Sequence, residues 1–310
     1  MSEATQISPP ELNPIRAARG CKDLVWVGVV AVLWLLFYRV DILTLIAQWQ
    51  GDSGWSHGFA IPVVSLWMVW LKWDVLKKLP VNGSWVGLPV LLLGALVHIL
   101  FLTFAQHMGL FHVSQLSMPV TLLGLVLFLL GWDFLRILWL PICFLPFMIV
   151  PPHVFYAQMT TPLQNLSAIT ASNLLPLVGI GSVHSSTQIL IETANGKMES
   201  LNVAEACSGM RLLLAFVALS VAMAYTSDRP MWQKVIVVLM AVPVAIICNV
   251  LRVFIIALLF VWVDPKYARG STHENIGLLM LPVAALLLWG VSWILNQLFI
   301  EEPVAEVKPR

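Results

Sequence analysis

The sequence predicts an all-α polytopic membrane protein with about eight transmembrane helices. Hydrophobic residues make up 59% of the 310 residues and charged residues only 11%, whereas soluble domains contain about 25% charged residues. Several apolar runs reach the roughly 20 residues that a helix needs to cross a bilayer. The formal net charge of +1 gives no indication that the chain binds nucleic acid.

The first half of the chain contains the first five expected spans. Residues 1–20 are polar and lack the pattern of a cleaved signal peptide, so we expect residues 1–23 to form a cytoplasmic N-terminal arm. The spans are expected at residues 24–38, 59–73, 85–104, 116–130 and 134–150. Residues 24–299 are expected to form one membrane domain, and residues 300–310 a cytoplasmic tail.

Residues 151–207 are expected to form a small extracytoplasmic region before the sixth span. Pro151 and Pro152 end the fifth span. Residues 155–177 are only mildly apolar and predict an amphipathic helix on the membrane surface, or alternatively a re-entrant segment. Residues 188–203 predict a β-hairpin, because Asn195-Gly196 separates two strand-like runs.

Three spans are expected in the last third of the chain, at residues 212–225, 235–263 and 276–299. The run 235–263 is apolar except for Asn249 and Arg252. At ~1.5 Å per residue its length is ~43 Å, which exceeds the ~30 Å hydrocarbon core. This run is therefore one bent or tilted helix, or two short ones.

The distribution of Lys and Arg predicts the orientation, because cytoplasmic segments carry an excess of both. With residues 235–263 as one span and both termini inside, most of the 17 basic residues lie inside. Those on the inside are Arg16, Arg19, Lys22, Lys72, Lys77, Lys78, Arg136, Arg229, Lys234, Lys308 and Arg310. This places Cys207 and the loop 264–275 together on the outer face, whereas two short spans would place them on opposite sides.

Cys207, Arg252 and His273 then meet at the outer membrane boundary and form a candidate catalytic site. A thiolate is a nucleophile that a helix N-terminus or a nearby cation stabilises, and a histidine can shuttle its proton. Arginine is too basic to shuttle protons, but it can stabilise an oxyanion. The backbone N–H groups of Ser208 and Gly209 could bind the same oxyanion.

Each of these residues also has a structural alternative. Cys207 could be a small packing residue, Arg252 a snorkelling anchor, and His273 an interfacial cap. Arg211 is more simply a snorkelling residue or a local charge partner than a catalytic group, and Glu205 suits a helix N-terminus equally well.

The other cysteines and histidines are expected to be structural. Cys143 and Cys248 lie inside apolar runs, and the scatter of the four cysteines indicates neither a disulfide framework nor a metal site. No cofactor is expected. The remaining histidines are expected at interfaces or in loops: His98, His107, His112, His153 and His184.

Several motifs together resemble the exosortase/archaeosortase family over about residues 26–296. They are residues 206–211 (Ala-Cys-Ser-Gly-Met-Arg), residues 249–253 (Asn-Val-Leu-Arg-Val), and His273 with Gly277 four positions on. Residues 55–62 (Trp-Ser-His-Gly-Phe-Ala-Ile-Pro) resemble the Ser-His-Gly…Pro segment of that family. The resemblance assigns Cys207 as the nucleophile, with Arg252 and His273 as its partners. It adds Asn249 and His57 as supporting residues, and it leaves open whether His57 is structural or faces the substrate.

The resemblance implies a membrane-embedded cysteine protease and transpeptidase in the cytoplasmic (inner) membrane, with its site on the periplasmic face. Its substrates would be exported proteins with a PEP-CTERM-like C-terminal tail, which consists of a short motif, a transmembrane helix and a basic cluster. The acceptor would be water, an amine, or a lipid- or saccharide-linked group. The alternative functions are a membrane transporter or polysaccharide-export component, and a non-catalytic scaffold.

Overall fold

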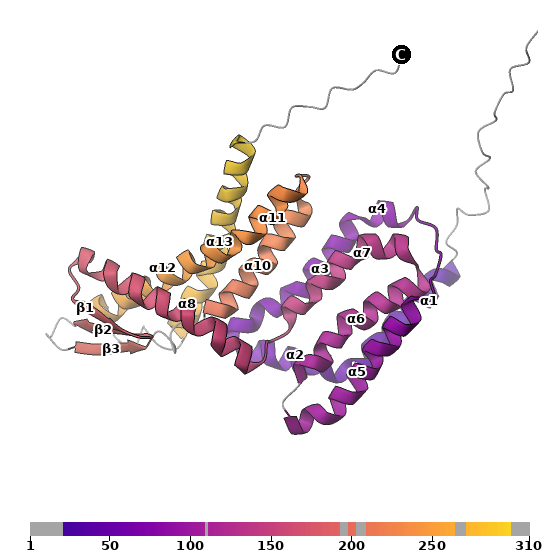
Figure 1. The fold of residues 1–310 in the computed structure, drawn as a ribbon, viewed down its shortest axis with the longest axis horizontal. Helices are drawn as coiled ribbons and strands as arrows, with labels where there is room; N and C mark the ends of the chain where they lie inside the picture. Colours follow the sequence, from indigo (N-terminus) through magenta and orange to yellow (C-terminus); the bar gives the residue numbers. More distant parts are fainter. Residues whose placement is uncertain (1–20, 109–110, 193–197, 203–208, 264–270, 299–310) are drawn as a thin grey trace, which may run out of the picture.

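The structure, a computed structural model, describes residues 21–108, 111–192, 198–202, 209–263 and 271–298. These residues form helices and one small sheet (Figure 1). Three helical runs among them are long and apolar enough to cross a membrane: Phe111–Leu129, Met231–Trp262 and Asn275–Leu298. The bent pair Gly28–Phe37 and Arg39–Gly51 could form a fourth. The predicted all-α membrane fold is confirmed, and the number of eight spans stays a prediction.

The N-terminal half of the molecule is built from helices that pack side by side (Figure 1). They are α1 (Cys21–Phe37), α2 (Arg39–Gly51), the 3₁₀ segment η2 (Ser53–Phe59), α3 (Ala60–Leu71), α4 (Trp73–Leu76), α5 (Gly87–Met108), α6 (Phe111–Leu129), α7 (Trp132–Phe144) and the 3₁₀ segment η3 (Leu145–Met148). Helices α5 and α6 form a hairpin, and α7 packs against both α6 and α3.

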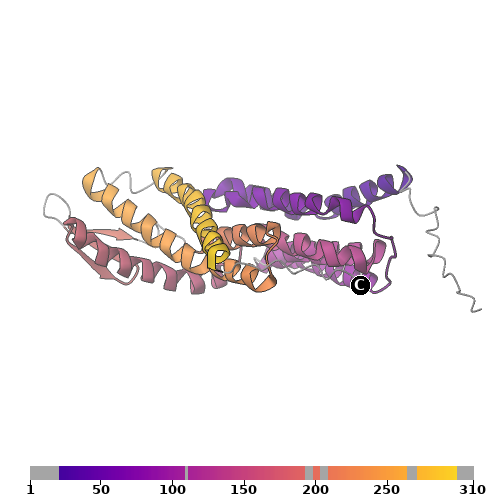
Figure 2. The ribbon, with the colours of Figure 1, turned by 90° about the horizontal axis from the view of Figure 1, so that it is seen from above.

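The C-terminal half contains the sheet and the helices of the candidate site. Its elements are α8 (His153–Leu174), η4 (Leu175–Val178), β1 (Ser182–Ser185), β2 (Gln188–Glu192), β3 (Met198–Asn202), α10 (Gly209–Thr226), α11 (Met231–Leu239), α12 (Ala241–Trp262) and α13 (Ser271–Leu298). Helix α12 lies between α8 and α13 (Figure 2) and packs against both.

The long apolar run in this half is one helical run rather than two spans. Only Met240 separates α11 from α12, and it keeps a right-handed helical conformation with φ −67° and ψ −12°. Its N–H bonds the Ile236 carbonyl at 2.9 Å, and its carbonyl accepts from the Val244 N–H at 3.1 Å. Pro243 explains the short break, because it has no N–H to donate to the carbonyl of Leu239.

The small sheet confirms the two strands of the predicted hairpin and adds a third strand. β2 pairs antiparallel with β3, with Ile189 opposite Leu201, and also with β1. The turn between β2 and β3 lies outside the described residues. Ile189, Ile191 and Leu201 are buried in one hydrophobic cluster with residues of α8 and α12. The sheet is therefore fixed to the helices that carry the candidate site.

Helix α8 is amphipathic, as the sequence predicts, but one of its faces packs against other helices of the chain. Ala168, Ala171 and Ser167 are buried, while Leu166 and Leu174 are exposed. The buried face contacts α12 and α10. Small side chains on this face let the two helices approach closely, so α8 forms a wall of the membrane domain.

The sequence does not predict helix α2 or the segment η2. The predicted spans leave residues 39–58 outside the membrane helices. In the structure α1 and α2 are separated at Tyr38 and meet at an angle of 69°. Sharp bends usually occur at Pro or Gly, or where side chains disturb the helix. Residues 29–50 contain neither Pro nor Gly, so the cause lies in the side chains around Tyr38.

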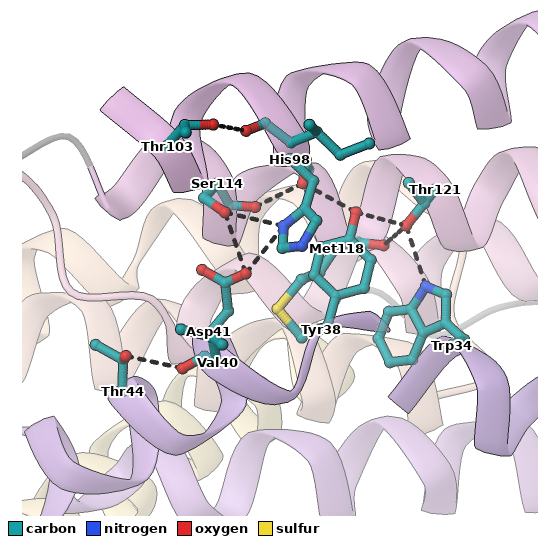
Figure 3. Close-up of polar contacts among 12 residues, drawn as sticks. Trp34, Tyr38, Val40, Asp41, Thr44, His98, Thr103, Ser114, Met118 and Thr121 are labelled. Carbon is teal, nitrogen blue, oxygen red and sulfur yellow. Dashed lines mark hydrogen bonds and ion pairs between the residues drawn. The ribbon is translucent and has the colours of Figure 1, made fainter. Parts of the chain in front are cut away.

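A buried polar cluster lies at this bend, and its first part joins α2 to α5 and α6 (Figure 3). The carboxylate of Asp41 lies 3.0 Å from Nδ1 of His98 and accepts a hydrogen bond from the Ser114 hydroxyl at 3.1 Å. Asp41 and His98 are each only 2% exposed. The prediction that His98 is an interfacial or loop residue is therefore wrong.

The second part of the cluster joins the end of α1 to α6 (Figure 3). The hydroxyls of Tyr38 and Ser117 share a hydrogen bond of 2.9 Å. Thr121 donates to the Tyr38 oxygen at 3.1 Å, and the Trp34 indole donates to Thr121 at 3.0 Å. Burying a polar group without a hydrogen-bond partner costs free energy. Because these hydrogen bonds avoid that cost, they favour the bent arrangement of α1 and α2.

Asp41→Ala is expected to destabilise the protein by about 3 kcal/mol, because breaking a buried pair leaves the other partner without compensation. Thermal unfolding of the purified protein in detergent would measure this loss. Asp133→Ala is the matched control, since Asp133 pairs with Arg136 at 3.6 Å on the surface, where such a pair contributes about 1 kcal/mol or less. Equal melting temperatures for the two variants would contradict the proposed contribution of the cluster.

Candidate active site

Arg252 lies on α12 with its side chain buried at 8% exposure. Its guanidinium lies against Gly277 of α13: a Cβ added to Gly277 would be 3.0 Å from Nη2 and 3.1 Å from Cζ of Arg252. A Cβ at position 277 would therefore require the guanidinium to shift by a few tenths of an ångström. The arginine is thus held inside the protein at the interface of α12 and α13, whereas a snorkelling anchor would extend to the lipid surface.

Position 273 lies one helical turn before Gly277, the residue that contacts the Arg252 guanidinium. His273 belongs to the first turn of α13, four residues before Gly277. Residues four apart lie on the same face of a helix, with ~5–6 Å between their Cβ atoms. The backbone thus brings position 273 close to the guanidinium of Arg252, and the shared catalytic site stays a prediction.

Cys207 lies outside the described residues, as do Glu205 and Ser208. Helix α10 begins at Gly209, two residues after Cys207. The predicted place of the cysteine, immediately before a helix N-terminus, stays a prediction. Helix α10 also packs against α12 and α13, so the segment that contains Cys207 leads into the same group of helices as Arg252.

Arg211, in the first turn of α10, is a charge partner, but its partner is distant in sequence rather than local as predicted. Its Nη1 atom lies 2.5 Å from Oδ1 of Asp52. The same carboxylate oxygen accepts the Gly54 N–H at 3.0 Å and so caps the segment η2. A Cβ at Gly54 would overlap the Arg211 side chain. The pair and the glycine together hold η2 against the start of α10.

Asp52 is a site residue that the sequence analysis missed. An Asp immediately before a Ser-Gly turn is a helix N-cap signal, and this signal could have predicted its local role. Its pairing with Arg211, 159 residues away, has no local signal.

His57 lies on η2, which packs against both α10 and α13. Its Nε2 is buried and has no hydrogen-bond partner among the described residues. Burial lowers the pKa of His57, although a hydrogen bond with the Gly54 backbone opposes this effect. The imidazole is therefore neutral near pH 7. The Ser-His-Gly motif thus lies beside the helices of the candidate site, with one imidazole nitrogen unused.

Asn249 connects the arginine-bearing helix to α8. Its Nδ2 donates to the hydroxyl of Ser167 at 2.7 Å, and it lies one turn before Arg252 on α12. Its Oδ1 is buried and has no hydrogen-bond partner among the described residues. In this structure Asn249 fixes the position of α12 relative to α8, close to Arg252.

The Asp41–His98–Ser114 cluster contains the residue types of a hydrolase triad but not its geometry. In a triad the acid and the nucleophile contact opposite nitrogens of the histidine. Here Nδ1 of His98 lies 3.0 Å from the Ser114 hydroxyl and also 3.0 Å from Asp41. The cluster is also buried away from solvent. It stabilises the fold and does not form a second catalytic centre.

No other described group of residues resembles a reactive or metal-binding centre. Cys248 is fully buried, and Cys143 is on the outer surface of α7. Across residues 21–298, within the described ranges, no three His, Cys, Asp or Glu side chains gather as metal ligands would.

Comparison with known proteins identifies the family. The family model described as transmembrane exosortase (Exosortase_EpsH) matches residues 49–290. Neither a curated protein nor a solved structure matches the chain. The matched region runs from the C-terminal end of α2 to the last part of α13, and so contains η2, Arg252 and positions 207 and 273. The chain is therefore a multi-pass membrane protein that belongs to the transmembrane exosortase family.

Proposed function

We propose that this exosortase is a cysteine protease and transpeptidase that cleaves the C-terminal sorting tail of exported proteins. The substrate would carry a short PEP-CTERM-like motif, a transmembrane helix and a basic cluster. Cys207, Arg252 and His273 would form the catalytic site at the outer face of the cytoplasmic membrane. The observation that carries this proposal is the burial of Arg252 against Gly277, one helical turn from His273.

The energetic cost of Arg252 supports a functional role. An arginine in an apolar span costs about 2.5–3.5 kcal/mol on insertion scales. Arg252 is held at a helix interface, beside a glycine that leaves room for its guanidinium. A buried cation in this place can stabilise both a thiolate and an oxyanion.

The proposed reaction begins when the Cys207 thiolate attacks a backbone carbonyl carbon of the sorting motif. A C–S bond forms, and the oxygen becomes an oxyanion that Arg252 and the Ser208 and Gly209 N–H groups stabilise. The C–N bond then breaks as His273 donates its proton to the leaving amine. Water or an acceptor amine next attacks the thioester carbonyl and gives a proton to His273, the C–S bond breaks, and the thiolate is regenerated.

A transporter is the second candidate, and one observation favours it. Ionisable groups inside a membrane bundle often mark a transport path, and the Asp41–His98 cluster is such a group. Asp41, His98 and Ser114 bond one another and are each 2% exposed or less. A cluster closed in this way offers no open site to a substrate, so acyl transfer is the better supported function.

Cys207→Ala is expected to abolish cleavage of a co-expressed tailed protein from the source organism, by at least about 10³-fold, because the nucleophile is lost. Immunoblots of the full-length and trimmed forms would measure this. Cys143→Ala is the matched control and should cleave at the wild-type rate. Trimming by Cys207→Ala at a comparable rate would refute the proposed reaction.

Gly277→Ala is expected to lower the cleavage rate by about tenfold, because the added methyl group requires the Arg252 guanidinium to shift by a few tenths of an ångström and the reaction depends on its position. Gly290→Ala is the matched control on the same helix, since a Cβ there meets nothing within 4 Å. Both variants should be produced and melt like the wild type. Wild-type cleavage by Gly277→Ala would show that the position of Arg252 is not critical.

A further inference from the structure

A pocket of about 470 Å³ lies beside the pair of Asp52 and Arg211. Ligand pockets in proteins usually measure ~300–1,000 Å³, so its size suits a side chain and the adjacent backbone of a bound peptide. Five separate parts of the chain form its wall: the end of α2, η2, the start of α6, the linker between η3 and α8, and the first turn of α10.

The pocket is close to the proposed nucleophile and to the Ser-His-Gly motif. Arg211 forms part of its wall and follows Cys207 by four residues, a separation that an extended chain covers in at most ~14 Å. Trp55, another wall residue, has its ring 5.7 Å from the ring of His57. A peptide whose carbonyl reaches Cys207 can therefore place a residue within about four positions of that carbonyl in the pocket.

The wall of the pocket selects against charge. Trp55, Phe111 and Val150 give it an apolar lining. The two oppositely charged residues in the wall, Asp52 and Arg211, form an ion pair with each other at 2.5 Å, so the pair contributes no net charge. The remaining titratable wall residue is His112, whose imidazole is not a fixed charge. A charged side chain that enters the pocket would therefore lose its hydration without gaining a fixed, unpaired opposite charge. An uncharged, apolar side chain would lose little favourable hydration and would bury apolar surface against the wall.

One polar atom of the wall favours a peptide over a lipid chain. Gln48 forms part of the wall, and its Oε1 is buried without a hydrogen-bond partner among the described residues. An unsatisfied buried acceptor costs ~1–3 kcal/mol, and a bound N–H group would remove that cost. A peptide backbone supplies such donors, whereas an acyl chain has none.

We propose that this pocket binds an uncharged, apolar residue of the substrate within about four positions of the scissile bond, with a backbone N–H of the substrate donated to Gln48 Oε1. Trp55 and Phe111 would determine the size of the residue that fits. The proposal rests on the proposed function of the chain, and it adds the residues that determine which tails are cleaved.

Photocrosslinking tests the binding without requiring cleavage. p-Benzoylphenylalanine would replace Phe111 in the Cys207→Ala protein, which is then co-expressed with a tailed protein from the source organism. The expected result is a crosslink to a residue of the short segment that precedes the tail helix. The matched control carries the same group at Phe128, on the other end of α6, and should not crosslink to this segment. Adducts with lipid alone, or no adduct at Phe111, would overturn the proposal.

Substrate variants test the selectivity in the wild-type enzyme. A substrate with Leu at the crosslinked position is expected to have a kcat/KM at least about tenfold higher than one with Asp. Trp55→Ala should change the ratio of kcat/KM between Ala and Leu substrates, whereas a general folding defect would lower both equally. Equal use of Leu and Asp would overturn the proposal. Continued cleavage by Cys207→Ala would instead refute the proposed reaction, and the crosslink at Phe111 would still report on the pocket.

Discussion

The burial of the Arg252 guanidinium is the constraint on which the rest of the site depends. A cation in an apolar helix is stable only where protein surrounds it, and Gly277 supplies the necessary space on α13. This contact sets the distance between α12 and α13 and brings position 273 to the arginine. On the other side of α12, the Asn249–Ser167 bond fixes α8. Helix α12 thus carries both the Arg252 guanidinium and Asn249, whose hydrogen bond to Ser167 orients the helix.

A second polar contact attaches the N-terminal half to this group of helices. The pair of Asp52 and Arg211 holds η2 at the start of α10, three residues beyond Ser208. Helix α2, which leads to η2, takes its direction from the bend at Tyr38 and the buried cluster around Asp41. The Asp41 cluster, the ion pair and the pocket thus follow one another along α2. The polar contacts of the cluster and the ion pair position the wall of the proposed binding site.

Local patterns predicted the parts of this structure that depend on neighbouring residues. The helix after residue 209, the two strands around residues 188–203 and the long apolar helical run that carries Arg252 all follow from periodicity and turn chemistry. The sequence did not predict α2, because Asp41 and Gln48 lower its apolar character while their environment comes from distant helices. It also missed the burial of His98 and the partner of Arg211, since such pairs leave no local pattern.

The most direct test of the central claim is to search for the covalent intermediate. Wild-type protein would be incubated with a tailed substrate and quenched in acid within the first turnover, and the peptide that contains Cys207 would be examined by mass spectrometry. The account predicts an adduct on Cys207 with the mass of the substrate's N-terminal fragment, sensitive to hydroxylamine and absent from Cys207→Ala. Cleaved product without any adduct on Cys207, together with product from Cys207→Ala, would contradict it.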